Sequence, residues 1–201
     1  KDNKDSLGNR IKTYENVQRS YLTRRMPVMV RLDGRAFHSY TKGFQRPFDL
    51  SIMEAMIAGA RAVAEEMQGF KLAYIQSDEA SFLLTDYDSL ETEAWFDNNV
   101  SKIISISASI MSVQFNYFIS QRYGERLDKF AYFDGRAFNV PREDVCNALL
   151  WRAKDWARNS ISMYARSFFS HKELNNKSCS DMHEMLHNIG KNWSTGLSNL
   201  E

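Results

Sequence analysis

The sequence contains little cysteine, no membrane-length apolar run and no linker-like segment. Two cysteines in 201 residues, Cys146 and Cys179, are too few for a disulfide framework, and we expect a protein of the reducing cytoplasm. No apolar run reaches the length of a bilayer span and no signal peptide precedes the first predicted strand, so we expect no membrane partner. No stretch rich in glycine, serine and proline divides the chain, which predicts a single domain over residues 1–201.

The chain also lacks an excess of charge of one sign. Lys and Arg number 26 and Asp and Glu number 25, which gives a formal net charge of +1. A nucleic-acid partner would therefore have to be held by local basic clusters and not by a bulk positive field. With 43% hydrophobic and 25% charged residues, the composition excludes a disordered chain and indicates a folded domain with one well-buried core.

Periodicity predicts alternating strands and helices. The first strand is expected at residues 28–32, between Pro27 and Gly34. The later elements are a helix ending near 67, strands at 72–75 and 80–84, a long helix after 97, a strand at 130–133 and helices between 141 and 189. This order is the split βαβ pattern of ferredoxin-like sheets. We therefore predict an α+β fold with a core at about 26–140 and a helical C-terminal portion at about 141–201.

Three expectations concern how the helices begin and pack. Asp49 or Ser51 is expected to cap the helix that ends near residue 67. Apolar residues at helical spacing predict an amphipathic helix over 11–25 that packs on the core. These residues are Ile11, Tyr14, Val17 and Tyr21. The long helix after residue 97, which Asp97 is expected to cap, is apolar on two faces and is therefore expected to be buried.

Two carboxylates are expected to meet at one edge of the sheet. Asp33 closes the first strand before Gly34, and Asp78 lies with Glu79 in the short connection between the hairpin strands. In the predicted topology these strands are neighbours, which would bring Asp33 and Asp78 together. Two close carboxylates repel each other unless a cation lies between them, and Mg²⁺ prefers oxygen ligands. The alternative is a solvated hairpin tip that binds no metal.

Basic residues crowd the segment around Asp33. They are Arg31, Arg35, His38, Lys42 and Arg46. This clustering predicts an anionic ligand, and a triphosphate held beside a metal ion would fit it. The segment 33–37 is repeated letter for letter at 134–138, where it is expected to follow the strand at 130–133. The residues alone do not decide which of the two copies carries the chemistry.

Several motifs together resemble one known family. They are residues 31–38, 76–82, 133–136, 150–152 with Asp155, and 158–161. The chain resembles the tRNA-His guanylyltransferases and their guanylyltransferase-like relatives, the 3′–5′ RNA polymerases, from about residue 5 to about residue 197. The resemblance implies a polymerase-type palm backed by helices in a single catalytic domain. It also implies a homo-oligomer, a tetramer built as a dimer of dimers.

The resemblance assigns roles to residues of the first copy of the repeat. Asp33, the Gly34 carbonyl and Asp78 would hold two Mg²⁺ ions, and Glu79 matches an acidic residue important for activity without being a direct ligand. The residues implied to line the nucleotide triphosphate site, with the basic loop added, are Asp33, Gly34, Arg35, Ala36, Phe37, His38, Lys42, Ser77 and Asp78. Residues 134–136 would then be a structural or RNA-side element.

The activity implied is nucleotide addition in the 3′–5′ direction to a tRNA 5′ end, with ATP and GTP as substrates. The 5′ end is activated by adenylylation or by an existing triphosphate, and the 3′-hydroxyl of the incoming nucleotide attacks it. In the segment 157–163 only Asn159 matches the motif of the eukaryotic enzymes. That difference resembles the guanylyltransferase-like branch, which repairs truncated tRNA 5′ ends by templated addition.

The C-terminal third leaves alternatives open. Candidate RNA contacts are Arg152, Asn159, His171, Lys172, Asn175 and Lys177, although the segment 170–177 could equally be a solvated loop. Cys179, His183 and His187 share one helical face, where zinc is conceivable but no standard zinc spacing is present. Two other functions also remain: another palm enzyme such as a nucleotide cyclase, and an RNA-binding module without catalysis.

Overall fold

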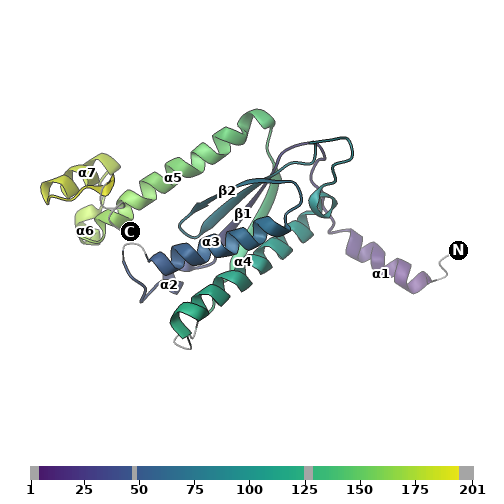
Figure 1. Ribbon diagram of the computed structural model, residues 1–201, viewed down its shortest axis with the longest axis horizontal. Coiled ribbons are helices and arrows are strands. Elements are labelled where there is room, and N and C mark those ends of the chain that lie inside the picture. The colour runs from purple at the N-terminus through teal and green to yellow at the C-terminus, as the bar shows by residue number, and fades with distance from the viewer. Residues whose placement is uncertain (1–4, 47–48, 125–128, 195–201) are drawn as a thin grey trace.

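The computed structural model describes residues 5–46, 49–124 and 129–194 (Figure 1). Its four-stranded antiparallel sheet has the order β2-β3-β1-β4. The strands are β1 Val28–Gly34, β2 Phe70–Gln76, β3 Glu79–Leu84 and β4 Phe133–Asn139. Helix α3, Leu50–Glu66, connects β1 to β2, and helix α4, Val100–Tyr123, connects β3 to β4. This is the predicted split βαβ arrangement, so the ferredoxin-like prediction is confirmed.

Helices α3 and α4 cover one face of the sheet, and α5, Val145–Ala165, lies on the other side (Figure 1). Alternation along β1 directs Val30 and Leu32, both fully buried, into the core beneath α3 and α4. Arg31 and Asp33 therefore belong to the opposite face. Asp49 caps α3 as predicted, because its carboxylate accepts hydrogen bonds from the backbone N–H groups of Ser51 and Ile52.

An N-terminal helix forms over residues 6–16 and not over 11–25 as predicted, and it does not pack on the core. Helix α1, Ser6–Asn16, contains no buried residue, and Figure 1 shows it extending away from the sheet. Ile11 and Tyr14 are 45% and 66% exposed, and Val17, just beyond the helix, is 75% exposed. The packing prediction was wrong because an apolar stripe shows that a helix needs a partner surface, not where that surface lies.

Helix α4 is buried along one stripe only, so the prediction that both of its apolar faces would be buried was wrong. Ile103, Met111 and Phe115 are at most 1% exposed, while Val113 and Tyr117 are 64% and 61% exposed. Asn99, and not Asp97, caps this helix. By length and composition α4 could cross a membrane, a test that the core helix of a folded domain also passes. Its extensive contacts with α3 and β4 identify it as such a core helix.

The two copies of the repeated pentapeptide adopt different structures. The first ends β1 and turns into the short helix α2, Phe37–Tyr40, with Ala36 at a left-handed φ of 53°. The second lies inside β4, so the strand expected at 130–133 in fact begins at residue 133 and continues through the repeat. Because β4 pairs along its length with β1, the extended form is fixed by pairing between strands and not by the five letters.

The C-terminal helices form a second, smaller apolar cluster beyond the sheet. The residues involved are Ile161, Tyr164, Ala165, Leu174, Met182 and Leu186. They bring α5 together with helix α6, His171–Leu174, and helix α7, Cys179–Asn188. Ser170 and Ser178 begin these two helices with reciprocal capping boxes. Residues 195–201 of the predicted C-terminal portion lie outside the described part of the chain.

Candidate functional site

The structure brings Asp33 and Asp78 together at one edge of the sheet. Asp33 is the penultimate residue of β1, and Asp78 lies in the two-residue turn between β2 and β3. The backbone N–H of Gly34 donates to the carbonyl oxygen of Asp78 over 3.0 Å, which fixes the end of β1 against this turn. Ser77 adopts a left-handed φ of 49° to make the turn. The juxtaposition expected from the topology is therefore present.

Both carboxyl groups have a raised pKa. Burial is the largest cause for Asp33, followed by the negative charges of Asp78, Glu79 and Asp134. Burial is likewise the main cause of the raised pKa of Asp78, although hydrogen bonds from its own backbone and from Ser77 oppose it. Two acids that are costly to ionise together favour a bound cation.

Glu79, the third acidic residue near Asp33 and Asp78, forms an ion pair with Arg152. It is paired with Asp33 across the β1–β3 ladder, so the two side chains rise from the same face of the sheet. The Nε and Nη2 atoms of Arg152, on α5, each donate to a Glu79 carboxylate oxygen over 2.7 Å. Glu79 is 8% exposed. Its charge is therefore paired with that of Arg152, with Arg31 Nε 4.0 Å away, although it still raises the pKa of Asp33 and Asp78.

The turn after Asp33 leaves several polar groups exposed. Arg35, His38 and Lys42 are exposed and have no side-chain partner within the described ranges. Phe37 is different, because its ring packs on Tyr40, Phe115 and Phe133 in the core. Only the backbone of Phe37 could line a nucleotide site. Cations and backbone N–H groups at this turn would suit a phosphate chain.

Gly34 is required by packing. A Cβ atom built there would lie 2.2 Å from the Phe37 ring, which occupies the space beside the end of β1. The glycine also has no side chain of its own that could block approach to its backbone from directions that the Phe37 ring leaves open. Its carbonyl can therefore serve beside the two carboxylates as an oxygen ligand.

These groups form a hard oxygen donor set that fits Mg²⁺. Two carboxylates and a carbonyl leave coordination positions for phosphate oxygens and water, which is how Mg²⁺ is commonly bound with nucleotides. Within the described residues no group of three His, Cys, Asp or Glu side chains is arranged to hold a metal. A complete protein cage is thus absent there, and the zinc alternative at Cys179, His183 and His187 has no support. The His183 ring instead contacts Trp193.

The predicted RNA contacts fall into three groups. Arg152 is engaged by Glu79 and Asp155, and its side chain is only 13% exposed, which leaves little of it for an RNA phosphate. Asn159 donates to Asp155 over 3.3 Å on the surface of α5. The remaining four residues, His171, Lys172, Asn175 and Lys177, are exposed. His171 and Asn175 line a cavity of about 200 Å³ together with Arg166.

Sequence reasoning missed two neighbours of Asp33. Asp134 pairs with Asp33 across the β1–β4 ladder, and Arg136 pairs with Arg31. The negative charge of Asp134 raises the pKa of Asp33 and the positive charge of Arg136 lowers it. Only the strand register reveals these pairs, because the repeated segment was expected to lie beyond the end of its strand. The second copy therefore contributes charge to the site formed by the first.

The family comparison matches the region that contains this edge. The family model described as tRNAHis guanylyltransferase matches residues 8–141, which is most of the chain. The chain belongs to this family. A tRNA(His) guanylyltransferase of Schizosaccharomyces pombe is 32% identical over 154 residues. Those residues are 75% of this chain but 56% of the yeast protein, so the chain spans little more than half of that relative.

Solved structures of the guanylyltransferase family agree with the fold. A bacterial tRNA(His) guanylyltransferase-like protein in complex with ATP superposes with a TM-score of 0.92 at 44% identity, covering 94% of this chain and 83% of that one. A structure of such a bacterial protein in complex with GTP gives a TM-score of 0.78 at 47% identity, covering 81% of this chain and 76% of that one. The sheet with its helices is therefore the palm-type fold of this family.

Proposed function

We propose that this protein is a Mg²⁺-dependent nucleotidyltransferase that adds nucleotides in the 3′–5′ direction to tRNA 5′ ends. The observation that carries the proposal is the meeting of Asp33 and Asp78 beside the Gly34 backbone. Family membership supports the reaction class, and the complexes of the two bacterial proteins with ATP and GTP support these nucleotides as substrates. The palm and the C-terminal helices would act as one catalytic domain in the cytoplasm.

The chain's own residues would mainly bind and orient the reactants. Asp33, the Gly34 carbonyl and Asp78 would hold two Mg²⁺ ions, and bound there the ions would supply neutralisation of phosphate charge and activation of the attacking hydroxyl. Arg35, His38 and Lys42 are free to bind triphosphate oxygens, and Ser77 lies beside Asp78. Such positioning and charge neutralisation account for most of the catalysis in phosphoryl-group transfer.

RNA is proposed to approach along the C-terminal helices. His171, Lys172, Asn175 and Lys177 offer donors on one exposed segment, at the end of α5 that leads to α6 and α7 (Figure 1). Sequence resemblance in the segment around Asn159 favours templated repair of truncated tRNA 5′ ends over strict addition of one G to tRNA-His. The choice between these two reactions is part of the proposal.

One incubation tests this function. The purified protein is incubated with Mg²⁺, ATP, labelled GTP and a tRNA lacking its 5′ nucleotide, and we expect label at the tRNA 5′ end together with pyrophosphate or AMP. Varying the base opposite the missing position should change which nucleotide is added. A parallel reaction without RNA is the control. A cyclic nucleotide formed there would show a cyclase, and RNA binding with no nucleotide addition would show a non-catalytic module.

A homo-oligomer, proposed to be a tetramer, would explain the exposed apolar surfaces. Leu7, Ile11 and Tyr14 on α1, together with Val113 and Tyr117 on α4, are each at least 45% exposed. A helix of 11 residues is only marginally stable in water unless it packs on something. Burying these side chains between subunits would stabilise α1 and cover the outer stripe of α4.

Light scattering coupled to gel filtration tests the assembly. We expect a mass about four times the 23.4 kDa of one chain. Substituting Ile11→Asp and Tyr14→Asp should release smaller species that keep helical circular dichroism from the rest of the protein, while Lys12→Asp on the same helix should not. A wild-type protein that is monomeric at micromolar concentration would contradict the proposal.

A further inference from the structure

One ion pair joins α5, the first of the C-terminal helices, to the carboxylate edge, which is the end of the sheet where Asp33 and Asp78 meet. Arg152 and Glu79 are 73 residues apart in the sequence, and their bidentate contact joins α5 to the first residue of β3. Both side chains are largely buried, at 13% and 11% exposure. A paired guanidinium and carboxylate in this geometry fix orientation as well as distance.

The surroundings hold the pair rigidly. The Gln76 side-chain amide, oriented to suit its neighbours, donates to the Arg152 carbonyl over 2.7 Å and accepts from its Nη2 over 2.9 Å. Asp155, one turn along α5, accepts from the same guanidinium over 3.2 Å. Trp151 lies against Arg152, with 4.6 Å between the guanidinium carbon and the ring centroid. The ion pair is therefore fixed by several neighbouring side chains, unlike a mobile ion pair on the surface.

Arg152 lies between the start of α5, which packs on the sheet, and the end of α5, which leads to α6. Near its start, α5 touches the sheet through a small apolar cluster that includes Met29, Leu83 and Val145. Arg152 comes next along the helix, and beyond it α5 leads to α6 and α7 (Figure 1). The exposed candidate RNA contacts lie on α6 and in the segment between α6 and α7. A change of angle at Arg152 would therefore be amplified at the C-terminal helices.

We propose that Arg152 is a positioning residue that, through Glu79, holds α5 and the RNA-side helices in register with the carboxylate edge. This inference rests on the proposed function. Glu79 then acts as the docking point for α5 and not as a group that touches the reactants. Its buried ion pair with Arg152 and the absence, among described residues, of a three-acid metal cluster agree with this role.

A double-mutant cycle on the full chain tests the proposal. Arg152→Met removes the fork while keeping much of the side-chain volume, and Glu79→Gln removes the charge of its partner. We expect Arg152→Met to lower kcat for nucleotide addition to tRNA by about 10- to 100-fold, because small misplacements of bound reactants are costly. The dissociation constants for GTP and for tRNA, measured separately, should change less than about threefold, because Arg152 is proposed to align the two reactants and not to bind either of them.

The cycle distinguishes docking from direct action. If Glu79 acts only through Arg152, adding Glu79→Gln to Arg152→Met should cause no further loss of kcat. A loss that multiplies in the double variant would overturn the proposal, since Glu79 would then have a role of its own. Arg152→Lys, which keeps the charge without the fork, should recover part of the activity and serves as the folding-safe variant. Arg61→Met, at an exposed position on α3, is the matched control.

A readout without turnover completes the test. In the nucleotide-free protein, Arg152→Met should speed amide hydrogen exchange in the turn at residues 76–79 and in the first half of α5, and Arg61→Met should not. Unchanged exchange in both segments would contradict the proposal even if activity fell. A wild-type protein that adds no nucleotide to RNA would instead reject the proposed function, and the exchange result would still decide whether Arg152 anchors α5.

Discussion

Asp78→Asn should abolish nucleotide addition while leaving a folded protein. The substitution keeps the shape of the side chain but removes a negative charge from the edge where Asp33 and Asp78 meet. Loss of several kcal/mol of charge stabilisation corresponds to a decrease of about 10³-fold or more in kcat. The measurement is single-turnover addition of labelled GTP to a 5′-truncated tRNA, with tRNA binding followed in parallel and expected to change little.

The repeated pentapeptide provides a matched control. Asp134 is preceded by phenylalanine and followed by the same four residues as Asp33, and it faces Asp33 across the β1–β4 ladder. It is exposed and lies within β4, which β1 separates from the hairpin of β2 and β3, so its charge reaches the site only beside Asp33. Asp134→Asn should therefore lower kcat less than about tenfold. Equal losses in the two variants would show that the reaction depends on general negative charge and not on the Asp33–Asp78 pair.

The same Asp78→Asn substitution should stabilise the metal-free protein at neutral pH. Burial raises the pKa of Asp78, so its ionised form is disfavoured in the folded state. The stabilising contribution of such a group is complete below its unfolded pKa, near the ordinary 3.8, and is lost as pH rises through the folded pKa. Asparagine avoids this loss, so thermal unfolding should give a higher Tm for Asp78→Asn than for wild type at pH 7, and the difference should disappear near pH 3.

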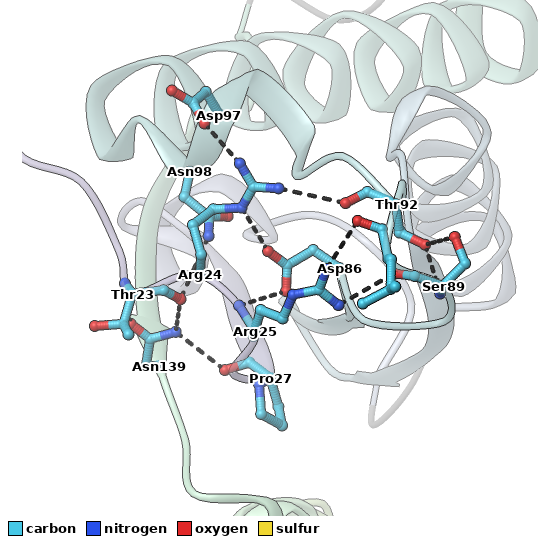
Figure 2. Close-up of polar contacts among 11 residues, drawn as sticks. Thr23, Arg24, Arg25, Pro27, Asp86, Ser89, Thr92, Asp97, Asn98 and Asn139 are labelled. Atoms are coloured by element: carbon cyan, nitrogen blue, oxygen red, sulfur yellow. Dashed lines mark hydrogen bonds and ion pairs between the residues drawn. The ribbon is translucent and has the colours of Figure 1, made fainter.

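Asp86→Ala should lower the free energy of unfolding more than the other substitutions described above. Figure 2 shows this carboxylate joining the segment before β1 to the loop after β3. It accepts from Arg24 Nε over 2.7 Å and from the Arg25 backbone N–H over 2.8 Å, and it is 4% exposed. Removing a charged, buried hydrogen-bond partner costs about 2–3 kcal/mol. For a chain of this size that lowers Tm by about 5–10 °C.

The far end of the same network supplies the control for Asp86. Asp97 also accepts from Arg24, over 3.0 Å, but its side chain is 77% exposed (Figure 2). Asp97→Asn keeps a residue that tolerates the local φ of 52° and should change stability by less than about 1 kcal/mol. Thermal unfolding of both variants decides the matter. A Tm for Asp86→Ala within 1–2 °C of the wild-type value is roughly the effect of losing an exposed ion pair. That result would show that Asp86 does not stabilise the contact between the segment before β1 and the loop after β3.

Local signals in the sequence predicted much of the fold. Asp49 caps α3 through hydrogen bonds to N–H groups two and three residues away, so the adjacent sequence was sufficient. The hairpin and the order of strands followed from short turns and periodicity, and together they placed Asp33 beside Asp78. The carboxylate edge was therefore within reach of sequence reasoning.

Features that depend on distant parts of the chain were not predicted. The pairing of β4 with β1 keeps the second pentapeptide extended and sets Asp134 opposite Asp33, although its letters equal those of the first copy. Arg152 meets Glu79 across 73 residues, and its charge alone suggested an RNA contact. The apolar stripe of α1 indicated a partner surface that the described part of the chain does not supply. In the first two cases tertiary neighbours decide the role of the residue, and for α1 the proposed assembly would do so.

The most direct test of a metal site shared by Asp33 and Asp78 is a crystal of the protein with GTP and Mn²⁺ in place of Mg²⁺, analysed by anomalous scattering. Metal peaks are expected within ligand distance of the carboxylate oxygens of both Asp33 and Asp78, beside the Gly34 carbonyl and the nucleotide phosphates. Peaks elsewhere, or a bound triphosphate with no metal between these two aspartates, would contradict the claim that they share divalent ions.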